Sequence, residues 1–119
     1  HSISHCNLAR QSEEIAAQEM AVSRTRIEQA LERPVLHFAY PYGDREAAGM
    51  REFALAASAG FKTAVTTRPG MLFAENAGHM TALPRISLNG NYQDTRILPV
   101  LTSGAATAMW NGFRRIAAA

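Results

Sequence analysis

Apolar residues recur at helical spacing in the first part of the chain. Their positions lie four, seven and four residues apart, which is the spacing of one face of an α-helix. The residues of this stripe are Ala16, Met20, Ile27 and Leu31. Ser12 is a suitable N-cap before the stripe, and Pro34 disfavours helical backbone in the residue that precedes it. The pattern predicts a helix over residues 12–33.

Two apolar segments flank a second helical segment. Residues 35–40 are apolar on both faces, which predicts a buried strand, and the β-branched composition of residues 61–67 predicts another. Asp44 is a suitable cap for a helix between them, over residues 45–59, and Gly60 is suited to end it. A strand, a helix of this length and a further strand form a βαβ unit, in which the two strands are parallel. The predicted fold class is therefore α/β.

The rest of the chain predicts shorter elements. Residues 68–82 have the composition of a loop, residues 83–88 form a short extended stretch, and Asn89 with Gly90 is a turn signal. Two helices are expected after this turn, from Asp94 to Leu101 and over residues 105–119. Three residues of the last helix share one side, namely Met109, Phe113 and Ile116. Core packing, rather than a sugar-binding platform, is expected for its two aromatic residues, Trp110 and Phe113.

The composition excludes several classes of protein. The chain has 119 residues, enough for one domain, and its 47% hydrophobic and 18% charged residues are typical of a globular fold. Twelve basic and ten acidic residues leave a net charge of +2, which is too small for a nucleic-acid-binding surface. No apolar run approaches the roughly 18 residues that a transmembrane span requires. With Cys6 as its single cysteine, the chain can form neither an internal disulfide nor a cysteine-rich zinc site.

Two histidines lie four residues apart at the start of the sequence. On a helical turn, His1 and His5 would have Cβ atoms about 5–6 Å apart, close enough for both imidazoles to bind one cation. Two ligands are an incomplete site, because catalytic zinc usually has three protein ligands and a water. The spacing alone favours two solvent-exposed histidines over a metal site. A further reading takes His1 as a mature amino terminus, whose α-amine and ring would bind copper together with His5.

Residues 38–43 follow the first predicted strand. In parallel α/β folds, ligands bind at the carboxyl ends of the strands. A Pro–Tyr–Gly bend at that place can expose the backbone N–H of Tyr42, a donor suited to a developing oxyanion. The same residues also fit an ordinary turn whose two tyrosines pack on a neighbouring loop. His37 alternates with apolar residues along the strand and is expected to pack inside the fold rather than to bind metal.

These two features, together with two later segments, resemble the polysaccharide deacetylases, the NodB-homology family also called carbohydrate esterase family 4. Residues 1–5 (His-Ser-Ile-Ser-His) resemble the family's His-Ser/Thr-x-x-His motif, and residues 38–43 resemble its Phe-Ala-Tyr-Pro-Tyr-Gly motif. Residues 60–67 and 83–86 resemble the segments that follow in this branch of the family. The resemblance extends over residues 1–87.

The resemblance implies a distorted (β/α)7 barrel with parallel strands, of which residues 1–119 would be an incomplete, carboxyl-terminal part. It implies a metal-dependent hydrolase that removes N- or O-acetyl groups from a polysaccharide or oligosaccharide. His1 and His5 would be ligands of a divalent metal such as zinc, and the backbone N–H of Tyr42 would bind the oxyanion. His79 is a candidate catalytic acid by residue type only. The residues expected to contact substrate are Tyr40, Pro41 and Tyr42.

The sequence departs from the family pattern in its acidic residues. The family's Asp-Asp motif, which provides the third metal ligand and the general base, lies upstream of the His motif, and the only aspartates here are Asp44 and Asp94. We therefore expect weak metal binding, little or no deacetylase activity from this chain, and self-association through open sheet edges. The alternative is a non-catalytic α/β module for sugar binding or assembly. The family is often exported or associated with the cell envelope, and the sequence itself does not decide the compartment.

Overall fold

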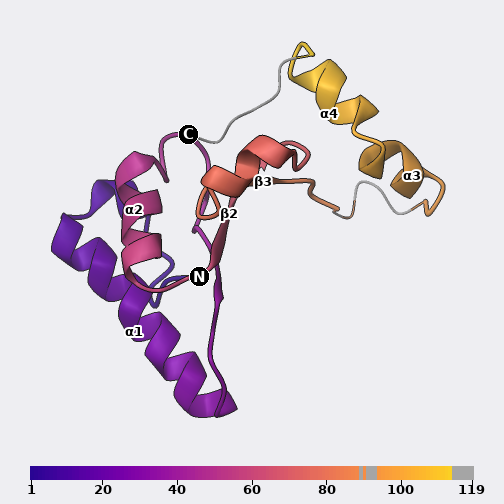
Figure 1. The fold of residues 1–119 in the computed structure, drawn as a ribbon. Coiled ribbons are helices and arrows are strands. Elements are labelled where there is room, and N and C mark those ends of the chain that lie inside the picture. The colour runs from indigo at the N-terminus through magenta and orange to yellow at the C-terminus, as the bar shows by residue number, and fades with distance from the viewer. Residues whose placement is uncertain (89, 91–93, 114–119) are drawn as a thin grey trace.

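The structure, a computed structural model, describes residues 1–88, 90 and 94–113. At its centre is a three-stranded parallel sheet with the strand order β1–β2–β3 (Figure 1). The strands are β1 (His37–Ala39), β2 (Thr63–Pro69) and β3 (Leu83–Arg85). Both pairings, β1 with β2 and β2 with β3, are parallel, so the predicted α/β class is confirmed. The described residues do not close a barrel.

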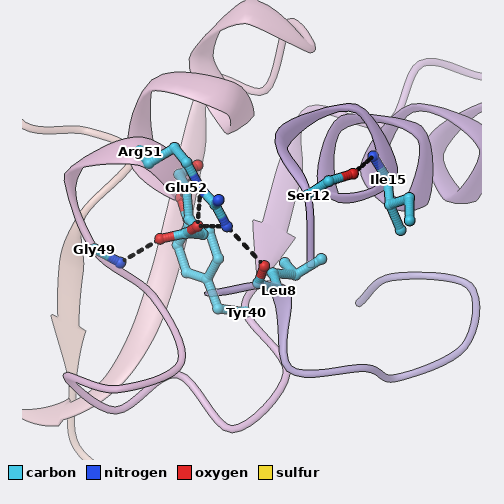
Figure 2. A network of polar contacts seen from close by, with 7 residues as sticks. All are labelled: Leu8, Ser12, Ile15, Tyr40, Gly49, Arg51 and Glu52. Atoms are coloured by element: carbon cyan, nitrogen blue, oxygen red, sulfur yellow. Dashed lines mark hydrogen bonds and ion pairs between the residues drawn. The ribbon is translucent and has the colours of Figure 1, made fainter. Parts of the chain in front are cut away.

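The first predicted helix is confirmed as α1 (Glu13–Leu31). Ser12 caps it, because its hydroxyl accepts a hydrogen bond from the backbone N–H of Ile15 at 3.3 Å (Figure 2). Only the first half of the predicted apolar stripe is buried, since Ile27 and Leu31 are 39% and 51% exposed. The side chain of Arg24 donates to the carbonyl of Ala59, at the end of the next helix in the chain. The residues of α1 after Arg24 therefore extend past that helix and are not covered by it.

The second helix, α2 (Met50–Ser58), begins five residues later than predicted. Asp44 does accept the backbone N–H groups of Glu46 and Ala47, both at 2.9 Å, but it caps a separate turn that does not continue into the helix. The predicted end is confirmed. Gly60 has φ +82°, and the hydrogen bonds of its own N–H and that of Phe61 to α2 carbonyls form a Schellman motif.

The core lies between the sheet, α1 and α2. Its large buried side chains are Leu8, Met20, Phe38, Tyr40, Phe53 and Phe61. The prediction that β1 is buried on both faces is wrong. His37 is exposed, and its Nδ1 lies 2.7 Å from the hydroxyl of Thr63 on the neighbouring strand. Among the described residues β1 has β2 as its one strand partner, so it is covered less than a central strand would be.

The carboxyl-terminal helices are α3 (Ile97–Thr102) and α4 (Ala105–Trp110), and Figure 1 shows them set apart from α1 and α2. After β2 the chain forms a loop that contains the short 3₁₀ helix η2 (Ala74–Gly78). Strand β3 follows this loop, and α3 and α4 follow β3. The core packing expected for Trp110 and Phe113 is wrong, because these side chains are 81% and 82% exposed and no described element covers them. Asn89 and Ile116 lie outside the described residues.

None of the helices in the described ranges combines the length and the apolar composition that crossing a membrane would require.

Candidate functional site

The structure brings the two predicted histidines together. The ring centroids of His1 and His5 are 4.9 Å apart, with the ring planes at 82°. The segment between them is a bend rather than a helical turn, and His5 has a positive φ of +56°. Nδ1 of His1 lies 2.6 Å from the carbonyl oxygen of Ala39 at the end of β1. Since a carbonyl can only accept, Nδ1 carries the proton and Nε2 of His1 keeps its lone pair for a ligand.

The Pro–Tyr–Gly bend lies beside this pair. The ring centroid of Tyr42 is 5.1 Å from that of His5, and its side chain is 56% exposed. Tyr42 has φ +62°, and no acceptor for its backbone N–H occurs among the described residues. Within the described residues, the bend therefore offers one backbone donor without a partner next to the histidines.

The end of β2 holds the bend in place. The hydroxyl of Thr67 donates to the carbonyl of Tyr42 at 2.6 Å, and the N–H of Thr67 donates to the carbonyl of Gly43 at 2.9 Å. Gly43 has φ +63°, and a Cβ at this position would lie 2.8 Å from the nitrogen of Thr67. Only glycine fits here, because both the backbone conformation and the close approach exclude a side chain.

The other two residues predicted to contact substrate are in the interior. Tyr40 is 1% exposed, and its hydroxyl donates to the carbonyl of Thr81 at 2.7 Å. Burial, with a smaller contribution from the charge of Glu52, raises the pKa of Tyr40. Pro41 is also fully buried. Of the three residues, Tyr42 alone presents its side chain to solvent in this structure.

Helix α1 supports the histidine bend with two residues that the sequence analysis did not single out. The carboxylate of Glu19 accepts the backbone N–H and the hydroxyl of Ser4, each at 2.9 Å. The hydroxyl of Ser23 donates to the carbonyl of His1. The hydrogen bond from the backbone of Ser4 is the largest of the effects that lower the pKa of Glu19. The available sequence signal was their i, i+4 spacing on one helix face, but it does not identify the segment they contact.

A second polar network joins the start of α2 to the segment after the histidines (Figure 2). Arg51 donates to the carbonyl of Leu8 at 2.9 Å and forms an ion pair with Glu52 at 2.7 Å. The other carboxylate oxygen of Glu52 accepts the N–H of Gly49 at 2.8 Å, which satisfies a free donor at the start of the helix. Glu52 is 3% exposed, so this carboxylate is part of the support of the site and not of its surface.

His79 is not brought to this group. It follows η2 and precedes β3, and the next residue, Met80, bonds to the backbone of Ala64 at the amino-terminal part of β2. Tyr42, in contrast, follows the carboxyl end of β1. Over the described ranges, no three residues among His, Cys, Asp and Glu come together in a way that could hold a metal ion. The described residues thus offer two adjacent imidazole donors, His1 and His5, of the kind that divalent cations bind, and no third ligand beside them.

Comparisons with known proteins identify a family and a similar fold. Residues 1–64, which contain both histidines and the bend, match the polysaccharide deacetylase family. The structure is similar to that of a Streptococcus pyogenes deacetylase, PplD, in complex with acetate, with a TM-score of 0.73 and 26% sequence identity. The similarity covers 85% of this chain and 42% of that one, so the chain spans less than half the length of the solved protein. No curated protein matches the sequence.

Proposed function

The chain belongs to the polysaccharide deacetylase family, and from this premise we propose that it forms part of a metal-dependent hydrolase that removes acetyl groups from a polysaccharide or oligosaccharide. The observation that carries the proposal is the trio of His1, His5 and Tyr42, whose neighbouring ring centroids are 4.9 and 5.1 Å apart. We further propose that the three-stranded sheet is the carboxyl-terminal portion of an incomplete (β/α)7 barrel, because its fold is similar to that of a longer deacetylase.

His1 and His5 would hold the divalent cation, for which zinc is the candidate. The protonated Nδ1 of His1 leaves Nε2 available, and the ring of His5 makes no hydrogen bond to the described residues. A bound cation of this kind lowers the pKa of water and polarises an acyl carbonyl. A third ligand and a general base would have to come from residues beyond this chain, since neither of its aspartates lies in the family's Asp-Asp context.

Tyr42 would stabilise the transition state through its backbone N–H. This donor is unused within the described residues, and Thr67 fixes the bend that carries it, so little reorganisation is needed when negative charge develops on an acyl oxygen. A single donor of this type contributes about 3–4 kcal/mol to lowering the activation barrier. The exposed ring of Tyr42 would contact the sugar. Substrate contact by Tyr40 and Pro41, and the acid role of His79, stay predictions from the sequence.

Deacetylase assays test the proposal. We expect little or no turnover of acetylated chitooligosaccharides with zinc by the 119-residue chain. A form extended before His1 by a segment that provides the family's Asp-Asp motif should be active. His5→Ala should abolish that activity, whereas His37→Ala, a matched change of an exposed histidine outside the site, should not. Robust turnover by the 119-residue chain would contradict the incomplete site. Sugar binding without turnover by the extended form would favour the non-catalytic module instead.

The sheet edges carry a second proposal about this chain. Within the described residues, β1 and β3 each have one strand partner, and unpaired edges favour association between chains. We propose that the 119-residue chain self-associates through these edges. Sedimentation velocity at rising concentration should show a larger species, and a single monomeric species throughout would exclude it.

A further inference from the structure

Two side chains of α1 fix both ends of the histidine bend. Ser23 donates to the carbonyl of His1, at the start of the bend, and Glu19 accepts both the N–H and the hydroxyl of Ser4, at its end. Glu19 and Ser23 are four residues apart and so lie on the same face of the helix. Both hydrogen bonds from Ser4, each 2.9 Å long, end on the carboxylate of Glu19, so their acceptor is a charged group when that carboxylate is ionised.

The bend needs such support because its backbone is not held by regular structure. Residues 1–5 belong to no helix or strand, and His5 has φ +56°, a conformation that costs a non-glycine residue about 1–2 kcal/mol. No hydrogen bond between the described residues 1–5 holds the two imidazoles at 4.9 Å, so their spacing depends on contacts with the rest of the fold. The hydrogen bonds from α1 act on the backbone and on Ser4, and neither touches the imidazole rings.

We propose that Glu19 and Ser23 are positioning residues, which hold His1 and His5 in the geometry that binds a divalent cation. The proposal rests on the two-histidine site of the proposed function. Glu19 acts through Ser4, and Ser23 acts through the carbonyl of His1. The hydrogen bond of His1 to Ala39 then orients one ring relative to β1. Partners that hydrogen-bond directly to a metal-binding side chain typically change metal affinity by about 10–100-fold when they are removed, so partners that act through the backbone should lie at the lower end of this range.

The experiment measures metal binding and not catalysis. Zinc is titrated into the 119-residue chain while the imidazole NMR signals of each histidine are followed, which separates His1 and His5 from His37 and His79. Glu19→Ala should weaken zinc binding at His1 and His5 by about 10-fold, the lower end of the range for direct partners of metal ligands. Glu19→Gln should restore part of it, because the amide oxygen still accepts the N–H of Ser4. Glu13→Ala removes a carboxylate of the same helix that contacts no residue of the bend and should leave the affinity unchanged.

A readout without metal accompanies the titration. In Glu19→Ala the amide of Ser4 should exchange with solvent faster, and the contact between the rings of His1 and His5 should weaken, while the midpoint of urea unfolding stays close to that of the unsubstituted chain. Ser23→Ala should have the same direction of effect, and Ser23→Thr, which keeps the hydroxyl, a smaller one. Unchanged zinc affinity in both alanine variants would overturn the proposal, as would the absence of zinc binding by the unsubstituted chain. Inactivity of the extended enzyme would overturn the proposed function alone.

Discussion

Two regions of the chain differ in whether they bury their large aromatic side chains. The layered region, residues 1–85, extends to the end of β3, and the second region consists of α3, α4 and the turn after them. In the first region, Phe38 and Phe53 are each 5% exposed. In the second, Trp110 and Phe113 are more than four-fifths exposed, at 81% and 82%, and neither helix has a buried residue. The difference lies in the layers, because α1, α2 and the sheet cover one another. The last helix has a more limited contact with the core region, such as the hydrogen bond from Asn111 to the carbonyl of Pro69.

The comparison shows why the candidate site lies where it does. Every group that positions the histidines and the bend belongs to the layered region: Glu19 and Ser23 on α1, Ala39 on β1 and Thr67 on β2. Groups on packed elements keep their geometry, whereas groups on an uncovered helix do not. The layered region should therefore carry both the stability and the chemistry of the chain.

Matched phenylalanine substitutions test this comparison with the largest expected effect. Phe38→Ala leaves a cavity among aromatic neighbours whose ring centroids are 5.0 and 5.2 Å away, and should lower the free energy of unfolding by about 3–5 kcal/mol. Phe113→Ala removes the same atoms from an exposed position and should change it by no more than about 0.5 kcal/mol. Urea denaturation measures both, and similar losses in the two variants would show that the turn after α4, which contains Phe113, contributes to the core after all.

Two glycines with the same backbone conformation sharpen the comparison. Gly43 and Gly112 have φ of +63° and +59°, but a Cβ at Gly43 would lie 2.8 Å from the nitrogen of Thr67, whereas none of the described atoms lies within 4 Å at Gly112. Gly112→Ala should destabilise by no more than about 1–2 kcal/mol, the cost of the left-handed conformation. Gly43→Ala adds the clash and should cost about 2–4 kcal/mol.

The measurement for this pair is again urea denaturation, together with the exchange rate of the Thr67 amide. In Gly43→Ala this amide should exchange faster, because its hydrogen bond to the carbonyl of residue 43 must lengthen. Equal destabilisation by the two substitutions would mean that the bend moves freely and that β2 does not hold it.

Local signals predicted the elements of the layered region well, and long-range packing explains what they missed. The cap at Ser12, the Schellman glycine Gly60 and the βαβ order are encoded within a few neighbouring residues. Asp44 misled because a capped turn and a capped helix have the same first hydrogen bonds. The exposure of Trp110 could not be predicted, since helical periodicity marks an apolar side without showing whether another element covers it.

The residues of the candidate site also fall into those that local sequence predicts and those that depend on long-range packing. His1, His5 and Tyr42 could be predicted, because their spacing and the resemblance to the deacetylases identify them together. The support from Glu19 could not, because it depends on where α1 folds back against the bend. The burial of Tyr40 likewise follows from contacts with Thr81, which is 41 residues away in the sequence. Residue type and local pattern predict reactive groups better than they predict the groups that hold them.

A pair of tyrosines two residues apart separates burial from residue type. Tyr40→Phe leaves the carbonyl of Thr81 without its donor and should destabilise by about 1–2 kcal/mol, whereas Tyr42→Phe removes an exposed hydroxyl and should have almost no effect. Because burial raises the pKa of Tyr40, its neutral form is favoured in the folded chain. The contribution of the Tyr40 hydroxyl to the free energy of unfolding is fully present below the ordinary tyrosine pKa of about 10. It is lost as the pH rises above that value.

Unfolding in urea at about pH 8 and about pH 11 tests this pH dependence. The unsubstituted chain and Tyr42→Phe should lose stability at the higher pH. Tyr40→Phe should lose less, since it has no buried hydroxyl to ionise. The same alkaline loss in all three proteins would place its origin elsewhere.

Two carboxylates, the half-buried Glu28 and the exposed Asp94, give the smallest expected effect. Glu28 accepts the N–H of Val35 at 2.9 Å and forms an ion pair with Arg24, and these contacts, the Val35 bond first, lower its pKa. Asp94 has a lowered pKa through its hydrogen bonds from Arg96. A carboxyl whose pKa is lowered by folding stabilises the folded chain above its ordinary pKa of about 4, and this contribution is lost as the pH falls through the lowered value.

Protonation of the two carboxylates should affect the stability of different parts of the chain. Glu28 joins α1 to the segment that enters β1, so Glu28→Gln should reduce the loss of global stability between about pH 5 and about pH 3. Asp94 lies before α3, outside the layered region, so Asp94→Asn should leave the global pH profile unchanged and alter only the amide exchange of that helix. If the two substitutions changed the global profile equally, the helices after β3 would unfold together with the sheet, and the two regions would be one cooperative unit.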